Sequence, residues 1–405
     1  MPTKDEFVGL FKKLVNTLLV LEFGYSGSPG RFGRFGEGAE RAVERHVPAD
    51  GRLNGSEPFF LRTWVDDGLE AEAFLYRRPY LGIRAYKECV RGLLGDDAIN
   101  ADKLEAEGET SEKTLAWGLE IDTVEDTFSL PDLKFQKAQW LVNQPEFRWG
   151  NKRLTRLQVQ VLRGNCTYWT IVCPSLKPEL ASIDRLLGGP AQDSEVIEGI
   201  DHEDWVRFRL SMEVIRILVE DVENWRNTFT QKSAGVLSTV ERMSMPSEKE
   251  KMVWTGGDAT KERVAAIDWN AKAFIAEDVD YYYDRLKDKM VGATEDIIIA
   301  VAELICFTLL ASLRGEGWMN RVVVYVSDNQ NVATWINSRY SKVPVVQALL
   351  RLLGLVDAKQ GFSAVSSYIR TWRNETADDL SREAREETAA RLISEGFTRL
   401  RDQDA

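Results

Sequence analysis

Four carboxylates in the last third of the chain occupy positions where acids can gather around a metal ion. Asp258 ends a predicted strand, and Glu303 is the only charged residue of the apolar stretch 297–313. Asp328 follows the β-branched run RVVVYVS, and Asp378 opens a predicted final helix. Clustered carboxylates raise one another's pKa unless a divalent cation neutralises them. Hard oxygen ligands suit Mg²⁺ or Mn²⁺, and two such ions can activate water and stabilise the leaving oxygen of a phosphodiester.

Each of these acids also has an ordinary structural explanation. Asp258 follows two glycines and could be a turn residue, while Asp328 could cap the helix after it. Asp378 would suit the dipole of a first helical turn. Glu303 is the hardest to explain in this way, because a lone acid inside an apolar helix costs free energy unless it is paired or metal-bound. The order and context of the four acids therefore carry more weight than any one of them.

The sequence around these acids predicts an α/β fold class, of the mixed α+β kind, because predicted buried strands alternate with predicted apolar helices. The predicted strands cover 252–255, 264–269, 321–327 and 362–369, and the predicted helices cover 297–313, 329–338, 343–354 and 377–400. Upstream, residues 132–245 have a helical apolar period, and residues 1–131 mix helices and strands. Within the latter, Val65-Asp66-Asp67-Gly68 predicts the turn of a hairpin.

Composition limits both the chemistry and the partners. The 405 residues, 44% of them apolar, suit two or three folded domains. Two histidines and four cysteines without a CxxC pair argue against His-based catalysis and a structural zinc site. The formal charge of −12 confines any nucleic-acid binding to local basic patches. The chain begins without a signal-peptide layout and has no membrane-length apolar stretch, so we expect a cytoplasmic or nuclear protein, not secreted and without membrane contact.

The acids and their neighbours resemble the ribonuclease H domain of retroelement reverse transcriptases. The resemblance rests on Gly257-Asp258-Ala259-Thr260, Ala302-Glu303-Leu304, Val326-Ser327-Asp328-Asn329 and Asn374-Glu375-Thr376-Ala377-Asp378-Asp379-Leu380-Ser381. It implies that the catalytic, metal-binding residues are Asp258, Glu303, Asp328 and Asp378, that they hold two Mg²⁺ or Mn²⁺ ions, and that the substrate is the RNA strand of an RNA–DNA hybrid. Asp268 competes for the first position and Asp379 for the fourth.

The resemblance to reverse transcriptases continues upstream to about residue 20. Residues 21–29 resemble the segment that supports template and nucleotide, 63–67 the metal-binding hairpin, 99–103 a lysine-bearing segment and 116–119 the primer grip. The resemblance implies Asp66 and Asp67 as metal ligands. The implied nucleic-acid contacts are Phe23, Gly24, Ser28, Pro29, Lys103, Trp117 and Gly118, together with the basic residues Arg148, Lys152, Arg153 and Arg156. The basic cluster could equally be a solvated helix face.

The resemblance also implies a division into domains. These are a partial reverse-transcriptase palm at 1–131, a helical thumb and connection at 132–245, a ribonuclease H-like α/β domain at 246–385 and a C-terminal helix and tail at 386–405. Trp64-Val65-Asp66-Asp67 and Ser327-Asp328-Asn329 resemble DIRS-like or Ty3-like elements. The oligomeric state stays open.

One departure concerns polymerisation. The family places a further aspartate on a strand well ahead of the Phe-Gly segment, and only Asp5 precedes Phe23 here, too close and in another pattern. We therefore expect the chain alone to cut hybrids without synthesising DNA. The competing hypotheses are a non-catalytic relic and a domesticated nucleic-acid-binding or interaction protein.

Overall fold

The computed structural model describes residues 28–64, 67–102, 105, 111–116, 118–125, 127–151, 153–188, 195–198, 200–220, 226–228, 252–278, 280–370, 373–382 and 385–400. The chain forms two compact units, Met1–Val124 and Glu125–Ala405. The second unit contains both the helical and the α/β stretches.

The first unit combines helices with two hairpins. Its elements are α2 (Ser28–Val43), α3 (Gly51–Asn54), β1 (Leu61–Trp64), β2 (Asp67–Glu70), α4 (Arg78–Leu94), the 3₁₀ helix η1 (Asp96–Ala98), β3 (Lys113–Ala116) and β4 (Leu119–Asp122). The expected hairpin is present, with Trp64 opposite Asp67. Buried Arg78 fastens the start of α4 to the preceding loop, because it pairs with Glu72 and donates to the carbonyl oxygen of Pro58 at 2.8 Å.

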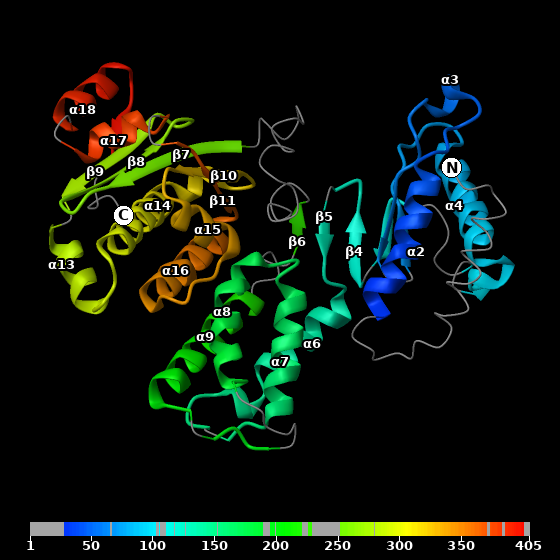
Figure 1. Cartoon of the computed structure of the whole chain (residues 1–405), viewed down its shortest axis with the longest axis horizontal. Helices are drawn as coiled ribbons and strands as arrows, with labels where there is room; N and C mark the ends of the chain where they lie inside the picture. The colour runs from blue at the N-terminus through cyan, green and yellow to red at the C-terminus, as the bar shows by residue number, and fades with distance from the viewer. Residues whose placement is uncertain are drawn as a thin grey trace. The chain divides into compact units, whose positions relative to one another are not determined.

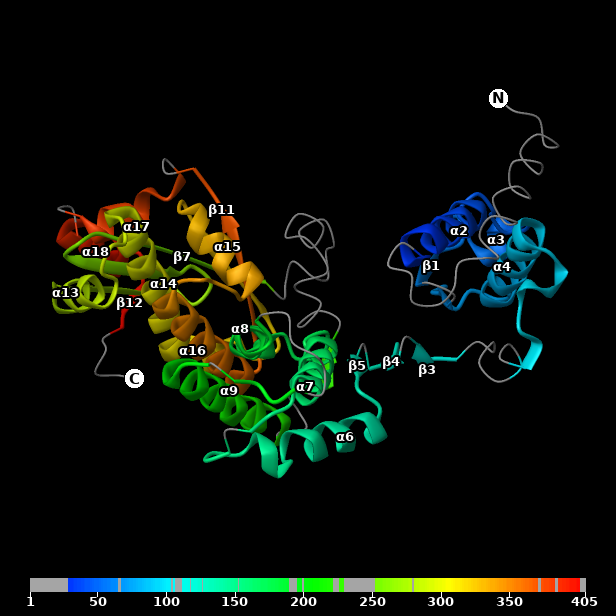
Figure 2. The same ribbon diagram turned by 60° about the horizontal axis from the view of Figure 1, so that its bottom comes forward.

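The second unit begins with a helical part. Its elements are β5 (Thr127–Ser129), α6 (Asp132–Val142), η2 (Pro145–Phe147), α7 (Arg156–Trp169), η3 (Pro174–Leu176), α8 (Lys177–Leu186), α9 (His202–Glu220) and β6 (Arg226–Thr228). The start of α7 is fixed by a capping box in which Thr155 and Gln158 each bind the other's backbone amide. In Figures 1 and 2, α8 and α9 lie beside α16 (Pro344–Gln360) of the α/β part.

The α/β part is built on one mixed sheet. Its other elements are β7 (Met252–Ala259), β8 (Arg263–Asp268), β9 (Ala273–Asp278), α13 (Asp280–Lys289), α14 (Glu295–Arg314), η6 (Gly315–Trp318), β10 (Val322–Ser327), α15 (Gln330–Ser338), β11 (Ser363–Tyr368), α17 (Glu375–Ser381), α18 (Arg385–Ser394) and β12 (Thr398–Arg399). The strand order is β11-β10-β7-β8-β9-β12. Strand β10 runs parallel to β7 and β11, while β7, β8 and β9 are antiparallel. The predicted mixed α/β class is confirmed.

Side chains alternate between the two faces of this sheet, as strand geometry requires. Val264 and Ala266 face the large core formed with α14, α15 and α16, whereas Ala265 and Ile267 face α17 and α18. Figure 1 shows these two groups of helices on opposite sides of the strands. This part of the chain therefore has three layers, with the sheet between α17 and α18 on one face and α14, α15 and α16 on the other. Helix α14 packs directly against β7 and β8.

Helix α14 is the core of its layer. By length and composition alone the stretch Glu295–Trp318 could cross a membrane, but 61% of its most apolar window is buried in the protein. Its apolar residues pack against the sheet, with Phe307 stacking on Trp318 and lying 4.5 Å, centroid to centroid, from Tyr325. The structure therefore places it as the buried helix expected at 297–313.

The end of the α/β part differs from the sequence expectation. The single helix predicted at 377–400 is wrong, because Ser381 ends α17 and Arg382 is extended, with φ −114° and ψ −160°. The chain then forms α18, turns at Gly396 with a positive φ of 87°, and adds β12 beside β9. Strand β9 and helix α13 were also not predicted. The sequence around these residues has a continuous helical pattern, but pairing of β12 with the edge strand β9 determines the structure that the segment adopts.

Candidate active site

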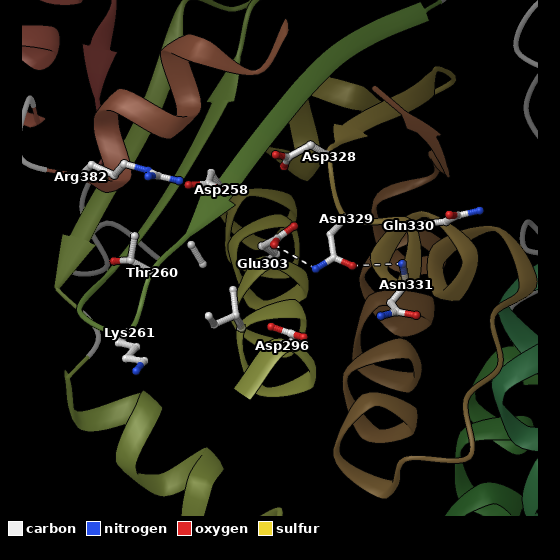
Figure 3. A pocket seen from close by; sticks show the side chains of 12 residues that line it. Asp258, Thr260, Lys261, Asp296, Glu303, Asp328, Asn329, Gln330, Asn331 and Arg382 are labelled. Atoms are coloured by element: carbon white, nitrogen blue, oxygen red, sulfur yellow. Dashed lines mark hydrogen bonds between the residues drawn. The ribbon is translucent and has the colours of Figure 1, made fainter. Parts of the chain in front are cut away.

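A cavity of about 620 Å³ lies where β7 and β10 end beside α14. Strands β7 and β10 are parallel and in register at Gly256 and Val326, so their carboxyl ends reach the same edge of the sheet. Asp258 and Asp328 therefore come together there, and Glu303 faces them from α14 (Figure 3). The other lining residues are Ala259, Thr260, Lys261, Asp296, Ile299, Asn329, Gln330, Asn331 and Arg382. Three of the four acids predicted from sequence thus line one cavity.

Glu303 is held in a single orientation by two donors. The hydroxyl of Ser327 donates to Oε2 at 3.0 Å, and Nδ2 of Asn329 donates to Oε1 at 3.1 Å. The residue is only 4% exposed. Burial, reinforced by the charges of Asp258 and Asp328, raises the pKa of Glu303 to about 8 although both hydrogen bonds lower it. This carboxyl therefore carries an electrostatic cost that a nearby cation would relieve.

Asp258 experiences the same kind of environment. It is 6% exposed and accepts a hydrogen bond from the hydroxyl of Ser381. Burial raises its pKa to about 6; the charges of Asp328 and Asp378 add to the rise, and Ser381 and Arg382 oppose it. Perturbed carboxyls in a shared cavity are typical of functional sites.

Asn374 connects the end of β7 with Asp328. Its side chain is 3% exposed, and Nδ2 donates to the carbonyl oxygen of Gly257 at 3.1 Å and to Oδ1 of Asp328 at 3.3 Å. Its own Oδ1 is a buried acceptor that receives no hydrogen bond from the residues that the structure describes. A buried acceptor of this kind has room to receive a hydrogen bond from a group that enters the site.

Asp378 reaches the site indirectly. It lies on α17, and its Oδ1 is 2.6 Å from Nη2 of Arg382. Arg382, and not Asp378, is part of the cavity lining, and Figure 3 shows its guanidinium pointing toward Asp258. The charge of Asp378 is still close enough to raise the pKa of Asp258.

The donor set fits a hard divalent cation in kind but is not a closed ligand shell. Carboxylate and amide oxygens are the ligands that Mg²⁺ and Mn²⁺ prefer, and the raised pKa values of Glu303 and Asp258 mark a site short of positive charge. Among the residues that the structure describes, however, no group of three or more His, Cys, Asp or Glu is arranged to hold a metal ion. The metal-binding role of the acids therefore stays a prediction.

The two competing aspartates occupy other positions. Asp268 is fully buried at the end of β8, where it accepts a hydrogen bond from Nε1 of Trp318 at 2.8 Å and lies 3.6 Å from Nε of Arg314. Its role is to hold η6 against the sheet. Asp379 lies on α17 and is not among the residues that line the cavity, and its carbonyl oxygen accepts from the amide of Arg382 at 3.4 Å.

Sequence reasoning missed several polar residues of the cavity, among them Asp296, Asn329 and Arg382. Asp296 lies two helical turns before Glu303, and this spacing of seven places both acids on one face of α14. Asn329 was quoted only as part of a motif, although it orients Glu303. Arg382 could not be found from periodicity, because the pattern around it predicted continuous helix.

The predicted polymerase residues are mostly untested. Phe23, Gly24, Asp66, Lys103, Trp117 and Lys152 lie outside the residues that the structure describes. Asp67 begins β2, and Gly118 has a positive φ of 76° in the turn between β3 and β4. Ser28 and Pro29, which the resemblance assigns to the segment that supports template and nucleotide, form the first turn of α2, where proline is well tolerated because no helical partner for its nitrogen is needed.

The predicted basic patch is partly available to a ligand. Arg148 and Arg153 are exposed, and Arg156 begins α7 and is half-buried. Trp149 is 53% exposed beside them, whereas Trp169 is buried in the helical core. Arg163 is engaged by Asp184, with Nε 2.5 Å from Oδ1.

Comparisons with known proteins add little to this picture. No family model and no curated protein matches the sequence. One solved structure that matches is the foamy viral protease-reverse transcriptase dRH in complex with double-stranded DNA, with 9% identity and a TM-score of 0.30. The match covers 77% of this chain and 46% of that one, so the chain spans less than half of its length. Because so low a TM-score does not establish a shared fold, the chemistry of the cavity has to be judged from its own residues.

Proposed function

We propose that the α/β part of the second unit is a ribonuclease H-type endonuclease that hydrolyses the RNA strand of RNA–DNA hybrids with divalent cations. The observation that carries this proposal is the meeting of Asp258, Glu303 and Asp328 in one cavity, although they come from a strand, a helix and a second strand. The residue order resembles that of the ribonuclease H family, and the presence of three of the four implied acids in one cavity supports the proposal.

Each residue of the site has a defined task under this proposal. Asp258, Glu303 and Asp328 would hold the cations, with Asp378 as the fourth acid beside Asp258. Bound Mg²⁺ or Mn²⁺ would supply a more acidic water and neutralise charge on a phosphodiester. Ser327 and Asn329 keep Glu303 aimed into the cavity, and Asn374 keeps Asp328 against the end of β7.

Recognition of the hybrid would depend on shape and charge more than on base sequence. Duplexes that contain RNA are contacted mainly at phosphates and 2′-hydroxyls. Arg148 and Arg153 are exposed cations with Trp149 exposed between them, and they suit contacts to a phosphate backbone. The formal charge of −12 predicts that this binding is sensitive to salt.

The test is cleavage of an end-labelled RNA–DNA hybrid by the full chain, with and without Mg²⁺. We expect cutting of the RNA strand only, lost in EDTA and reduced at least 100-fold by Asp328→Asn. The matched control is Glu316→Gln, since Glu316 is an exposed acid on η6 outside the cavity lining. Cleavage that survives Asp328→Asn unchanged would show that the cavity is not the active site.

A non-catalytic nucleic-acid-binding protein is the second candidate. The ion pair of Arg382 with Asp378 favours it, because it neutralises part of the acidic site without any metal. Hybrid binding that does not depend on divalent ions, together with an absence of cleavage, would favour this candidate over the nuclease.

A further inference from the structure

Arg382 is the cation that faces the predicted catalytic acids. Among the residues that the structure describes, two basic side chains line the cavity, and the other, Lys261, pairs with Glu295. Arg382 instead pairs with Asp378 at 2.6 Å and points toward Asp258 (Figure 3). It therefore supplies positive charge beside Asp258.

The backbone at Arg382 is held by hydrogen bonds, while its side chain is largely exposed. Its carbonyl oxygen accepts from Nη1 of Arg263 at 2.7 Å, and the preceding carbonyl of Ser381 accepts from the hydroxyl of Thr260 at 3.3 Å. The side chain itself is 59% exposed. An ion pair in such an exposed position contributes little free energy, so the guanidinium can exchange partners readily.

A phosphodiester that enters this cavity would need such a group. Its charge is repelled by the surrounding carboxylates, and cations between them would neutralise only the inner side of the phosphate. The planar guanidinium of an arginine presents parallel donors that match two phosphate oxygens. Arg382 lines the cavity, so its guanidinium is available to a phosphate there, and its backbone is held in place by hydrogen bonds.

We propose that Arg382 is an exchangeable counter-ion, which pairs with the catalytic acids in the cation-free protein and turns to a backbone phosphate of the nucleic acid once divalent cations bind. This inference rests on the proposed nuclease function. It assigns Arg382 a positioning role for the strand that is cut, and it predicts that the residue opposes metal binding while it supports substrate binding.

The first test measures Mn²⁺ binding to the full chain by electron paramagnetic resonance, without nucleic acid. Removing a positive charge beside the acids should tighten Mn²⁺ binding by about 3–10-fold in Arg382→Gln. Arg382→Lys, which keeps the charge, should bind Mn²⁺ as the parent does. The control is Arg321→Gln, the same charge change just ahead of β10 at the opposite end of the sheet, which should have no effect.

The second test measures binding of a labelled RNA–DNA hybrid by fluorescence anisotropy at several salt concentrations. Asp328→Asn is added to every variant so that the RNA strand stays intact. Arg382→Gln should weaken binding by about 5–10-fold and reduce the slope of log affinity against log salt by about 1. Arg382→Lys should keep most of that slope and lose about 2–3-fold, because a lysine makes the charge contact without the fork.

The outcomes separate this inference from the function on which it rests. Mn²⁺ binding of equal strength in the parent and Arg382→Gln would overturn the counter-ion role alone. An unchanged hybrid affinity and salt slope in Arg382→Gln would overturn the phosphate contact alone. Absence of Mn²⁺ binding in the parent and in every variant would overturn the proposed nuclease function, and this inference with it.

Discussion

Arg351 of α16 donates from Nε to Glu179 of α8 at 2.9 Å and so joins the helical part of the second unit to the α/β part. Glu179 is 1% exposed, and Arg351 also donates to Ser211 at 2.8 Å. Burial raises the pKa of Glu179 to about 6, although Arg351 lowers it. For Glu179, the cost of losing hydration therefore outweighs the attraction to Arg351. The pair contributes mainly to the specificity of the packing between α8 and α16, and little to its stability.

This relationship predicts opposite effects for single and double replacements. Arg351→Ala leaves a buried, unpaired carboxylate and should lower the free energy of unfolding by about 3–5 kcal/mol. Replacing both residues, Arg351→Met with Glu179→Leu, should be about neutral or slightly stabilising. Urea unfolding of the full chain, followed by circular dichroism, measures both. A double variant as unstable as Arg351→Ala would contradict the explanation from desolvation.

Glu303→Gln should stabilise the protein while it removes metal binding. Burial raises the pKa of Glu303 to about 8, so at pH 7 the folded protein bears a cost that a neutral side chain avoids. The gain should be about 1–3 kcal/mol, because the glutamine oxygen can still accept from Asn329 and its NH₂ group can donate to the hydroxyl of Ser327, with that bond reversed. Melting temperatures at pH 7 without metal measure this gain. Added Mg²⁺ should then raise the melting temperature of the parent but not of the variant.

The control for that comparison is Glu316→Gln, which removes an exposed acid outside the cavity. It should leave both the melting temperature and its response to Mg²⁺ unchanged. If Glu303→Gln lowered the melting temperature in the absence of metal, the Glu303 side chain would stabilise the fold, and its buried carboxyl would not be the source of an electrostatic destabilisation.

Asn374 is predicted to act on the site through Asp328. Asn374→Asp would place a second carboxylate against Asp328 and lose the donor to the carbonyl oxygen of Gly257. Hybrid cleavage should fall by roughly 10–100-fold, and the Mg²⁺ concentration for half-maximal cleavage should change, as is usual for residues that orient metal ligands. A purely structural role would lower the melting temperature without moving that Mg²⁺ concentration, which the titration detects.

The residues of the site that could be predicted from the sequence are those whose place depends on local sequence patterns. Those whose place depends on long-range contacts could not be predicted. Asp328 was found because a fully β-branched strand must be buried and must end at a sheet edge, and Glu303 because an acid in an apolar helix needs a partner. The structure brings both together with Asp258. Asp268 was undecided in the sequence, since only the fold shows it under the indole nitrogen of Trp318.

Other parts depended on contacts that no local pattern shows. Strand β12 exists because it pairs with β9, more than 120 residues earlier, and the helical period around it gave no sign of this. Arg382 enters the cavity because the chain becomes extended after α17, and a continuous helix would have carried it elsewhere. Tertiary pairing overrides helix propensity in such short segments.

Glu70 in β2 makes the stability of the first unit depend on pH. Burial, and then the charge of Glu72, raises its pKa to about 8, while Arg78 opposes the rise. Both carboxyl oxygens are buried and accept no hydrogen bond from the described part of the chain. Because the folded pKa lies above the ordinary value of 4.5, the contribution of Glu70 to stability is full below about pH 4.5 and is lost as the pH rises through 8.

The stability of Glu70→Gln should therefore fall less than that of the parent between pH 5 and 9, because the variant has no proton to release. The difference between the two proteins should be largest at the alkaline end. Hydrogen–deuterium exchange of α4 in the full chain measures this, since Arg78 at its start is held by the neighbouring Glu72. Glu72→Gln is the matched control: it breaks that buried pair and should speed exchange. An identical pH slope in Glu70→Gln and the parent would show that Glu70 is already ionised at pH 5 and that its burial costs nothing.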